Sequence, residues 1–133
     1  MASVFTLIMT KKLPGHFVWE DEHCIAIMTI QPIREGHLLV IPREEIDQWS
    51  DVPVEVAAHL MKVSHTIANA MKKVFTAQRI GLMIAGLEVP HTHIHLVPMD
   101  SMADLDFAYA KNAEAEDLAK TAAAIRAALE QDS

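Results

Sequence analysis

The sequence predicts an α+β fold: an antiparallel five-stranded sheet with one long central helix and a C-terminal helix. Short strand-like runs fill the first third of the chain, and a long segment with apolar residues at helical spacing follows them. Two further strand-like runs then precede a second helical segment. The chain has 133 residues, 51% hydrophobic and 22% charged. These values favour one globular domain over residues 1–133.

The N-terminal third contains four short strand-like runs. Residues 4–9 are apolar and read as the first. Residues 16–20 and 24–30 resemble a hairpin around an acidic turn. Residues 37–41 form the next apolar run, and Pro42 ends it because proline lacks a backbone N–H for the ladder.

A long helix is predicted next, because Asp51 and Pro53 are typical helix-start residues. Its apolar face recurs every three or four residues. That face consists of Ala57, Leu60, Met61, Ser64, Ile67, Met71 and Phe75. Residues 79–85 and 91–97 are predicted strands.

The last segment is predicted to be a helix with Asn112 as its N-cap. Acidic residues follow the cap, where the positive end of the helix dipole stabilises them. Its apolar stripe consists of Leu118, Ala122, Ile125 and Leu129.

Composition restricts the partners and the compartment. The net charge of −7 argues against a general nucleic-acid binder. Cys24 is the single cysteine, so an internal disulfide is excluded and a reducing compartment is expected. Cys24 itself is predicted to be a small buried apolar residue. The first residues lack the pattern of a secretory signal, and apolar runs fall short of the ~20 residues that span a bilayer. We therefore expect a cytoplasmic protein that binds neither nucleic acid nor membrane.

Three histidines alternate in the stretch HTHIHLVP, residues 91–98. In a strand, His91, His93 and His95 share one face. At ~3.4 Å per residue the outer two lie about 13–14 Å apart, so one metal ion cannot readily bind all three. A metal site on two of them with a ligand from elsewhere stays an alternative, although the sequence offers no HExxH motif or cysteine pair.

The favoured interpretation is nucleophilic catalysis at phosphorus. A neutral imidazole is available near pH 7, and histidine forms covalent intermediates. The central His93 would attack while flanking N–H groups stabilise the phosphate oxygens. His37 heads a neighbouring strand and would point to the same phosphate. Four histidines remain, and they are predicted to be surface residues or to have their hydrogen bonds satisfied within the fold. They are His16, His23, His59 and His65.

With this motif the chain resembles the histidine triad (HIT) family, and in particular its purine nucleoside phosphoramidase branch. Only Thr92 departs from the apolar spacers of the signature, and Gly36-His-Leu-Leu-Val-Ile-Pro42 is similar to a second family block. The resemblance covers most of residues 4–99, whereas residues 101–133 form a less typical C-terminal extension.

The resemblance implies a nucleotide hydrolase or transferase that acts on the α-phosphate of purine nucleoside phosphoramidates or related mixed phosphates. His93 would carry the nucleotidyl group, His91 and His95 would flank it, and His37 would assist. The resemblance implies no metal and no cofactor, and it implies a homodimer whose sheets join. Its implied nucleotide-binding residues are Phe5, Ile8, Thr29, Ile30 and Leu39.

Some positions depart from the family pattern. Thr29 stands where an Asp often holds the ribose, Glu45 replaces a histidine, and the N-terminal cysteine pair of zinc-binding members is absent. The loop before the triad is shortened to residues 85–90, which places Glu88 near the phosphate site. A dinucleoside polyphosphate hydrolase and a nucleotide-binding scaffold with little turnover therefore remain alternatives.

Overall fold

The computed structural model describes residues 2–131, so the two ends of the expected domain, residue 1 and residues 132–133, lie outside the described residues. Five strands form one antiparallel sheet in the order β1-β2-β3-β5-β4. They are β1 (Phe17–Glu20), β2 (Cys24–Met28), β3 (Leu38–Pro42), β4 (Arg79–Ile84) and β5 (Ile94–Met99). The α+β prediction with a five-stranded antiparallel sheet is confirmed.

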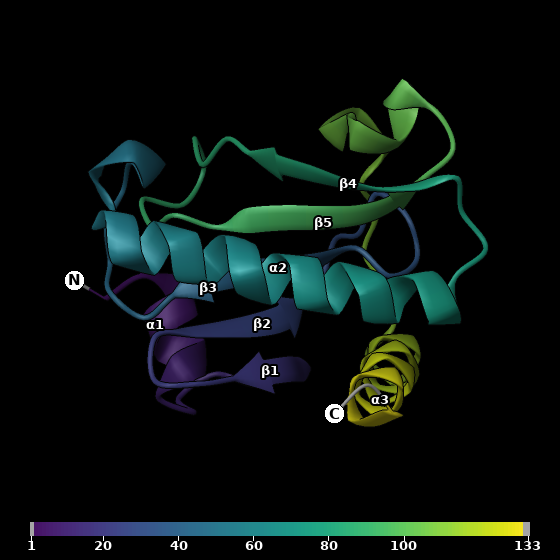
Figure 1. Ribbon diagram of the computed structural model, residues 1–133, viewed down its shortest axis with the longest axis horizontal. Coiled ribbons are helices and arrows are strands. Elements are labelled where there is room, and N and C mark those ends of the chain that lie inside the picture. Colours follow the sequence, from purple (N-terminus) through teal and green to yellow (C-terminus); the bar gives the residue numbers. More distant parts are fainter. Residues whose placement is uncertain (1, 132–133) are drawn as a thin grey trace.

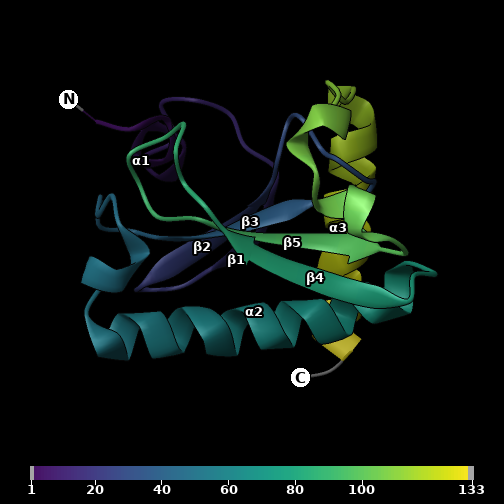
Figure 2. The same cartoon turned by 90° about the horizontal axis from the view of Figure 1, so that it is seen from above.

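Helix α2 (Val54–Val74) covers one face of the sheet, and α3 (Ala115–Gln131) lies across its end near β1 (Figures 1 and 2). The predicted apolar stripes drive this packing, because burial removes their side chains from water. In α2 the buried residues include Leu60, Ile67 and Met71, whereas Met61 is half exposed and its assignment to the core face is wrong. In the described chain, no helix is long and apolar enough to cross a membrane.

Residues 4–9 form a helix, α1 (Val4–Met9), and the prediction of a strand there is wrong. The side chain of Ser3 accepts a hydrogen bond from the Thr6 backbone N–H, which caps the helix. A short apolar run fits either a strand or a buried helix, and the cap decides between them. Helix α1 lies on the face of the sheet opposite α2, where Phe5 packs against an apolar cluster that includes Leu39 and Ile41.

The predicted N-cap of the last helix is also wrong. Helix α3 begins at Ala115, and the Glu114 carbonyl accepts its first hydrogen bond, from Leu118. The Asn112 side chain instead accepts a hydrogen bond from the Gln31 side chain at 3.0 Å. Three short 3-10 turns complete the chain: η1 (Trp49–Asp51), η2 (Met102–Leu105) and η3 (Phe107–Tyr109).

Candidate active site

The predicted strand over residues 91–97 begins only at Ile94, so His91 and His93 precede β5. The Thr92 backbone N–H and hydroxyl both donate to the Ile46 carbonyl at 2.7 Å, which draws this segment out of the sheet. The imidazoles nevertheless form a continuous row with Phe5. The centroid of the Phe5 ring lies 5.6 Å from that of His91 and 5.0 Å from that of His93. The centroids of the His93 and His95 rings lie 4.9 Å apart.

The hydrogen bonds of His93 determine which of its nitrogens is free. Its Nδ1 lies 2.7 Å from the backbone carbonyl of His91, and a carbonyl only accepts, so Nδ1 carries the proton. In the neutral ring, Nε2 therefore keeps its lone pair. His93 lines a cavity of about 170 Å³ together with His95, Phe107 and residues 85–88. The structure thus places at this cavity an imidazole with the orientation that nucleophilic attack through Nε2 would require.

His37 and His95 form a buried pair next to His93. The Ile33 backbone N–H donates to His37 Nδ1 at 3.0 Å, so the proton of neutral His37 lies on Nε2. That Nε2 lies 2.9 Å from His95 Nδ1, which must accept, and the His95 proton is therefore on Nε2. His95 is therefore an N–H donor in its neutral form, and it lines the same cavity as His93.

Burial keeps this pair neutral. It lowers the pKa of His37 to about 4. Burial, with the neighbouring His37 and His93, lowers the pKa of His95 to about 3. Gly36 allows the backbone conformation that leads into His37. It has a φ of +96°, which favours glycine, and a Cβ there would lie 2.6 Å from the Phe75 ring.

The pKa values predict a loss of stability in mild acid. Both values are depressed below the unfolded value near 6.5, so the unfolded chain binds protons first as the pH falls. The free energy of unfolding should therefore decrease from pH 6.5 towards pH 4, by up to about 1.4 kcal/mol per pH unit for each such histidine. Urea unfolding across this range measures the slope. The slope should be smaller in His37→Gln and unchanged in the exposed-site control His65→Ala. An equal slope in His37→Gln would contradict the assignment.

His91 is a structural member of the triad and is completely buried. Its Nε2 donates to the Pro42 carbonyl at 2.7 Å, and its Nδ1 accepts from the Ser3 hydroxyl at 2.6 Å. Burial lowers its pKa despite the hydrogen bond to Pro42. The Ser3 backbone N–H in turn donates to the Glu45 carboxylate. His91 thus ties α1 to the end of β3, and its own carbonyl orients His93.

Ser3→Ala should therefore destabilise the fold by about 2–3 kcal/mol, because it removes a helix cap and leaves His91 Nδ1 buried without a donor. Urea unfolding at pH 7 measures the change. Thr10→Ala is the matched control at the other end of α1, where the exposed hydroxyl bonds only to helix carbonyls. We expect that control to change stability by less than about 0.5 kcal/mol. Equal effects of the two substitutions would show that the contact with His91 is unimportant.

The implied nucleotide-binding residues fall into two groups. Phe5, Ile8 and Leu39 belong to the apolar cluster on the face of the sheet that carries the triad. Thr29 and Ile30 follow β2: the Thr29 hydroxyl accepts from the Gln31 backbone N–H, and the Ile30 side chain is 68% exposed. The contribution of these five residues to base or ribose binding stays a prediction.

Two residues near the triad were missed by sequence reasoning. The Phe107 ring lies edge-on to His95 at 4.9 Å, and it comes from the C-terminal extension. Ser3 was missed because α1 was predicted to be a strand. A serine immediately before an apolar run is a signal for a helix N-cap, whereas the sequence offers no signal for Phe107. Cys24 is buried as predicted, and burial raises its pKa to about 12, so it is a poor nucleophile.

Comparisons with known proteins identify the family of the chain. An uncharacterized HIT-like protein of Borreliella burgdorferi is 34% identical over 102 residues, which cover 71% of this chain and 73% of that protein. The adenosine 5'-monophosphoramidase HNT1 of Saccharomyces cerevisiae is 33% identical over 98 residues, 73% of this chain and 62% of the yeast protein.

The crystal structure of a HIT-like protein from Bartonella henselae superposes with a TM-score of 0.84 at 30% identity, covering 95% of each chain. The family model of the HIT domain matches residues 2–102. The chain therefore belongs to the histidine triad family.

Proposed function

We propose that the protein is a nucleotide hydrolase or transferase acting on the α-phosphate of purine nucleoside phosphoramidates or related mixed phosphates. The observation that carries this proposal is the orientation of His93: its Nδ1–H bonds to the His91 carbonyl, and its Nε2 lone pair is free at a cavity. The yeast relative named as an adenosine 5'-monophosphoramidase supports the choice of substrate class.

The reaction has two steps. His93 Nε2 attacks the α-phosphorus, the bond from phosphorus to the leaving group breaks, and the leaving amine takes a proton that water supplies. The nucleotide is then held on His93 as a phosphoramidate. Water attacks the same phosphorus and releases one proton to solvent, the bond to Nε2 breaks, and the nucleoside monophosphate departs. The His95 Nε2–H stabilises the negative oxygens in both steps.

A substrate panel with mass detection tests the proposal. Rapid quenching with adenosine 5'-phosphoramidate should reveal a chain heavier by one adenylyl group, together with release of adenosine monophosphate. Release of a nucleoside polyphosphate only from dinucleoside substrates would favour a dinucleoside polyphosphate hydrolase. Tight nucleotide binding with neither adduct nor release would overturn the proposal in favour of a nucleotide-binding scaffold.

Glu88 is expected to weaken phosphate binding, because it lines the same cavity as His93 and a carboxylate repels a phosphate. Glu88→Gln should therefore lower KM for an anionic substrate by roughly two- to tenfold, with a smaller effect at high salt. Steady-state kinetics at two ionic strengths measure both quantities. Glu44→Gln, on an exposed loop outside the cavity, is the control. An unchanged or higher KM in Glu88→Gln would show that the carboxylate does not face the phosphate.

We further propose that the protein is a cytoplasmic homodimer whose sheets join along β4. This strand lies at the edge of the sheet, and Leu82 on it is 40% exposed. An edge strand offers unpaired backbone groups to a second copy. Sedimentation equilibrium should give twice the chain mass, and Leu82→Lys should shift the equilibrium towards the monomer.

A further inference from the structure

A second group of polar side chains lies on the face of the sheet that α2 covers, opposite the triad. Asp21 lies in the turn between β1 and β2, Cys24 begins β2, and His59 comes from α2. One atom from each of these side chains can act as a metal ligand, and the three atoms all lie within 4.8 Å of one another. The His59 Nε2 is 2.7 Å and the Cys24 Sγ is 3.7 Å from the same Asp21 oxygen, Oδ2.

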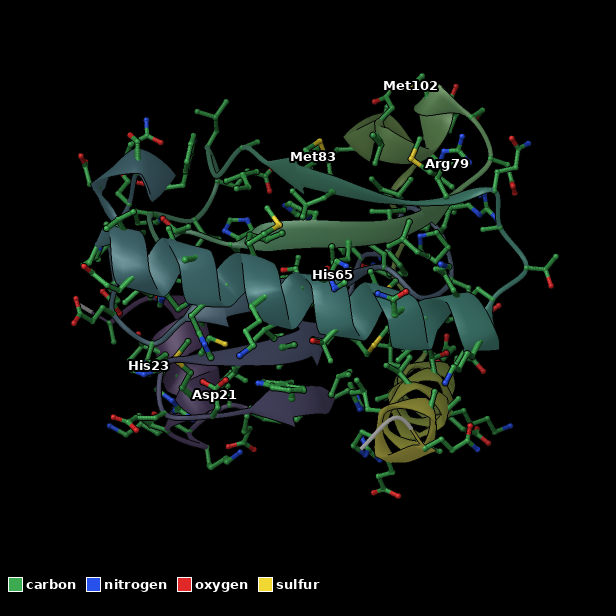
Figure 3. The ribbon with its side chains drawn as sticks, in the orientation of Figure 1. Asp21, His23, His65, Arg79, Met83 and Met102 are labelled. Atoms are coloured by element: carbon green, nitrogen blue, oxygen red, sulfur yellow. The ribbon has the colours of Figure 1, made fainter. Side chains whose placement is uncertain are left out.

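His23 lies beside this group, at its exposed side. Its ring packs edge-on to that of His59, with 5.2 Å between the ring centroids. Figure 3 shows Asp21 and His23 together beside the β1–β2 turn, whereas His65 lies further along α2. Two elements of the fold thus bring a carboxylate, a thiol and two imidazoles to one place.

The turn explains only part of this arrangement. Asp21 Oδ1 accepts from the backbone N–H groups of His23 and Cys24, and Oδ2 accepts from Trp19 Nε1 at 2.8 Å. These bonds account for the carboxylate as a turn cap. The Cys24 thiol and the His59 imidazole add to them, because both lie within hydrogen-bonding distance of the same oxygen, Oδ2, and both are groups that bind transition metals.

The ligand types select a class of metal ion. Zinc binds thiolate sulfur at ~2.3 Å and imidazole nitrogen or carboxylate oxygen at ~2.0–2.2 Å, so tetrahedral ligands stand about 3.3–3.8 Å apart. The separation of Cys24 Sγ from Asp21 Oδ2 already has this value, and the His59–Asp21 contact would open by roughly half an ångström. Calcium and magnesium prefer oxygen ligands alone, and a thiol and imidazoles exclude them.

We propose that Asp21, Cys24 and His59, with His23 as the fourth ligand, bind a divalent transition-metal ion of the zinc class. The ion replaces the thiol proton of Cys24, which passes to solvent, and it fastens the β1–β2 turn to α2. The function is structural, because the site lies across the sheet from the triad. The proposal is independent of the hydrolase proposal, and either can fail without the other.

Cobalt(II) titration of the reduced, tag-free full chain tests the site. A thiolate bound to cobalt gives a near-ultraviolet charge-transfer band, and Cys24 is the single cysteine of the sequence. The band therefore reports this site and is silent on cobalt bound by the triad histidines. We expect saturation at one ion per chain, displacement of the band by zinc, and a higher Tm with zinc because the ion binds only the folded chain.

Variants separate the proposed ligands from chance binding. Cys24→Ser should abolish the band, and His59→Gln should weaken cobalt binding at least tenfold. His23→Gln should weaken it less, because water can replace an exposed ligand. The control His65→Ala lies on the same helix away from the group, and it should bind cobalt as the unmodified protein does.

Far-ultraviolet circular dichroism checks that each variant is folded. If Cys24→Ser does not fold, His59→Gln decides the question, since that side chain is partly exposed. An unmodified protein without the band at excess cobalt would overturn the proposal. So would a His59→Gln variant with unchanged affinity.

Discussion

His93→Ala should reduce kcat for a nucleoside phosphoramidate by about 10⁴-fold or more, because it removes the nucleophile of the proposed covalent route. The adenylyl adduct seen by mass after rapid quenching should disappear with it. Binding of nucleoside monophosphate should change much less. The hydrogen bond that orients His93 goes to a backbone carbonyl, so removal of its side chain leaves the hydrogen bonds of the other imidazoles in place.

Two controls make the result specific. His65→Ala replaces an exposed histidine on α2 and should leave both kcat and the adduct unchanged. Urea unfolding of His93→Ala should show a cooperative transition, since within residues 2–131 the His93 side chain makes a single hydrogen bond, to the His91 carbonyl. Retention of the adduct in His93→Ala would place the nucleophile on another residue and refute the assignment.

His95→Ala should lower kcat by about 10²–10³-fold, the usual loss when one donor to a developing oxyanion is removed. Its low pKa, about 3, makes His95 a neutral N–H donor at pH 7 rather than a charged general acid. The loss should therefore be similar for a poor amine leaving group and for a good one such as fluoride. Steady-state kinetics with the two substrate types measure this.

The same comparison can contradict the assigned role. A loss confined to the poor leaving group would identify His95 as the acid that protonates it. His95→Ala also leaves the buried His37 Nε2–H without its acceptor, which costs about 1–3 kcal/mol. Urea unfolding should therefore accompany the kinetics, so that a lower folded fraction is not counted as lost catalysis.

The sequence alone determined the sheet, the long helix and the identity of the triad, because these follow from local periodicity. Short apolar runs predicted β2 and β3, helical spacing predicted α2, and the histidine pattern predicted the family. The periodicity failed at residues 4–9 and at His91, where a short apolar run and an alternating run fit more than one backbone conformation.

The tertiary structure decided how the histidines function. Each proton position depends on a partner distant in sequence or on the loop conformation: Ser3 and Pro42 for His91, and His37 for His95. The surroundings of His59 also depend on the fold. The sequence predicts no special role for it, whereas the fold places it against Asp21 and Cys24. A sequence pattern identifies which side chains are present. Their tautomers, pKa values and ligand groupings depend on burial and on contacts that form only when distant segments pack together.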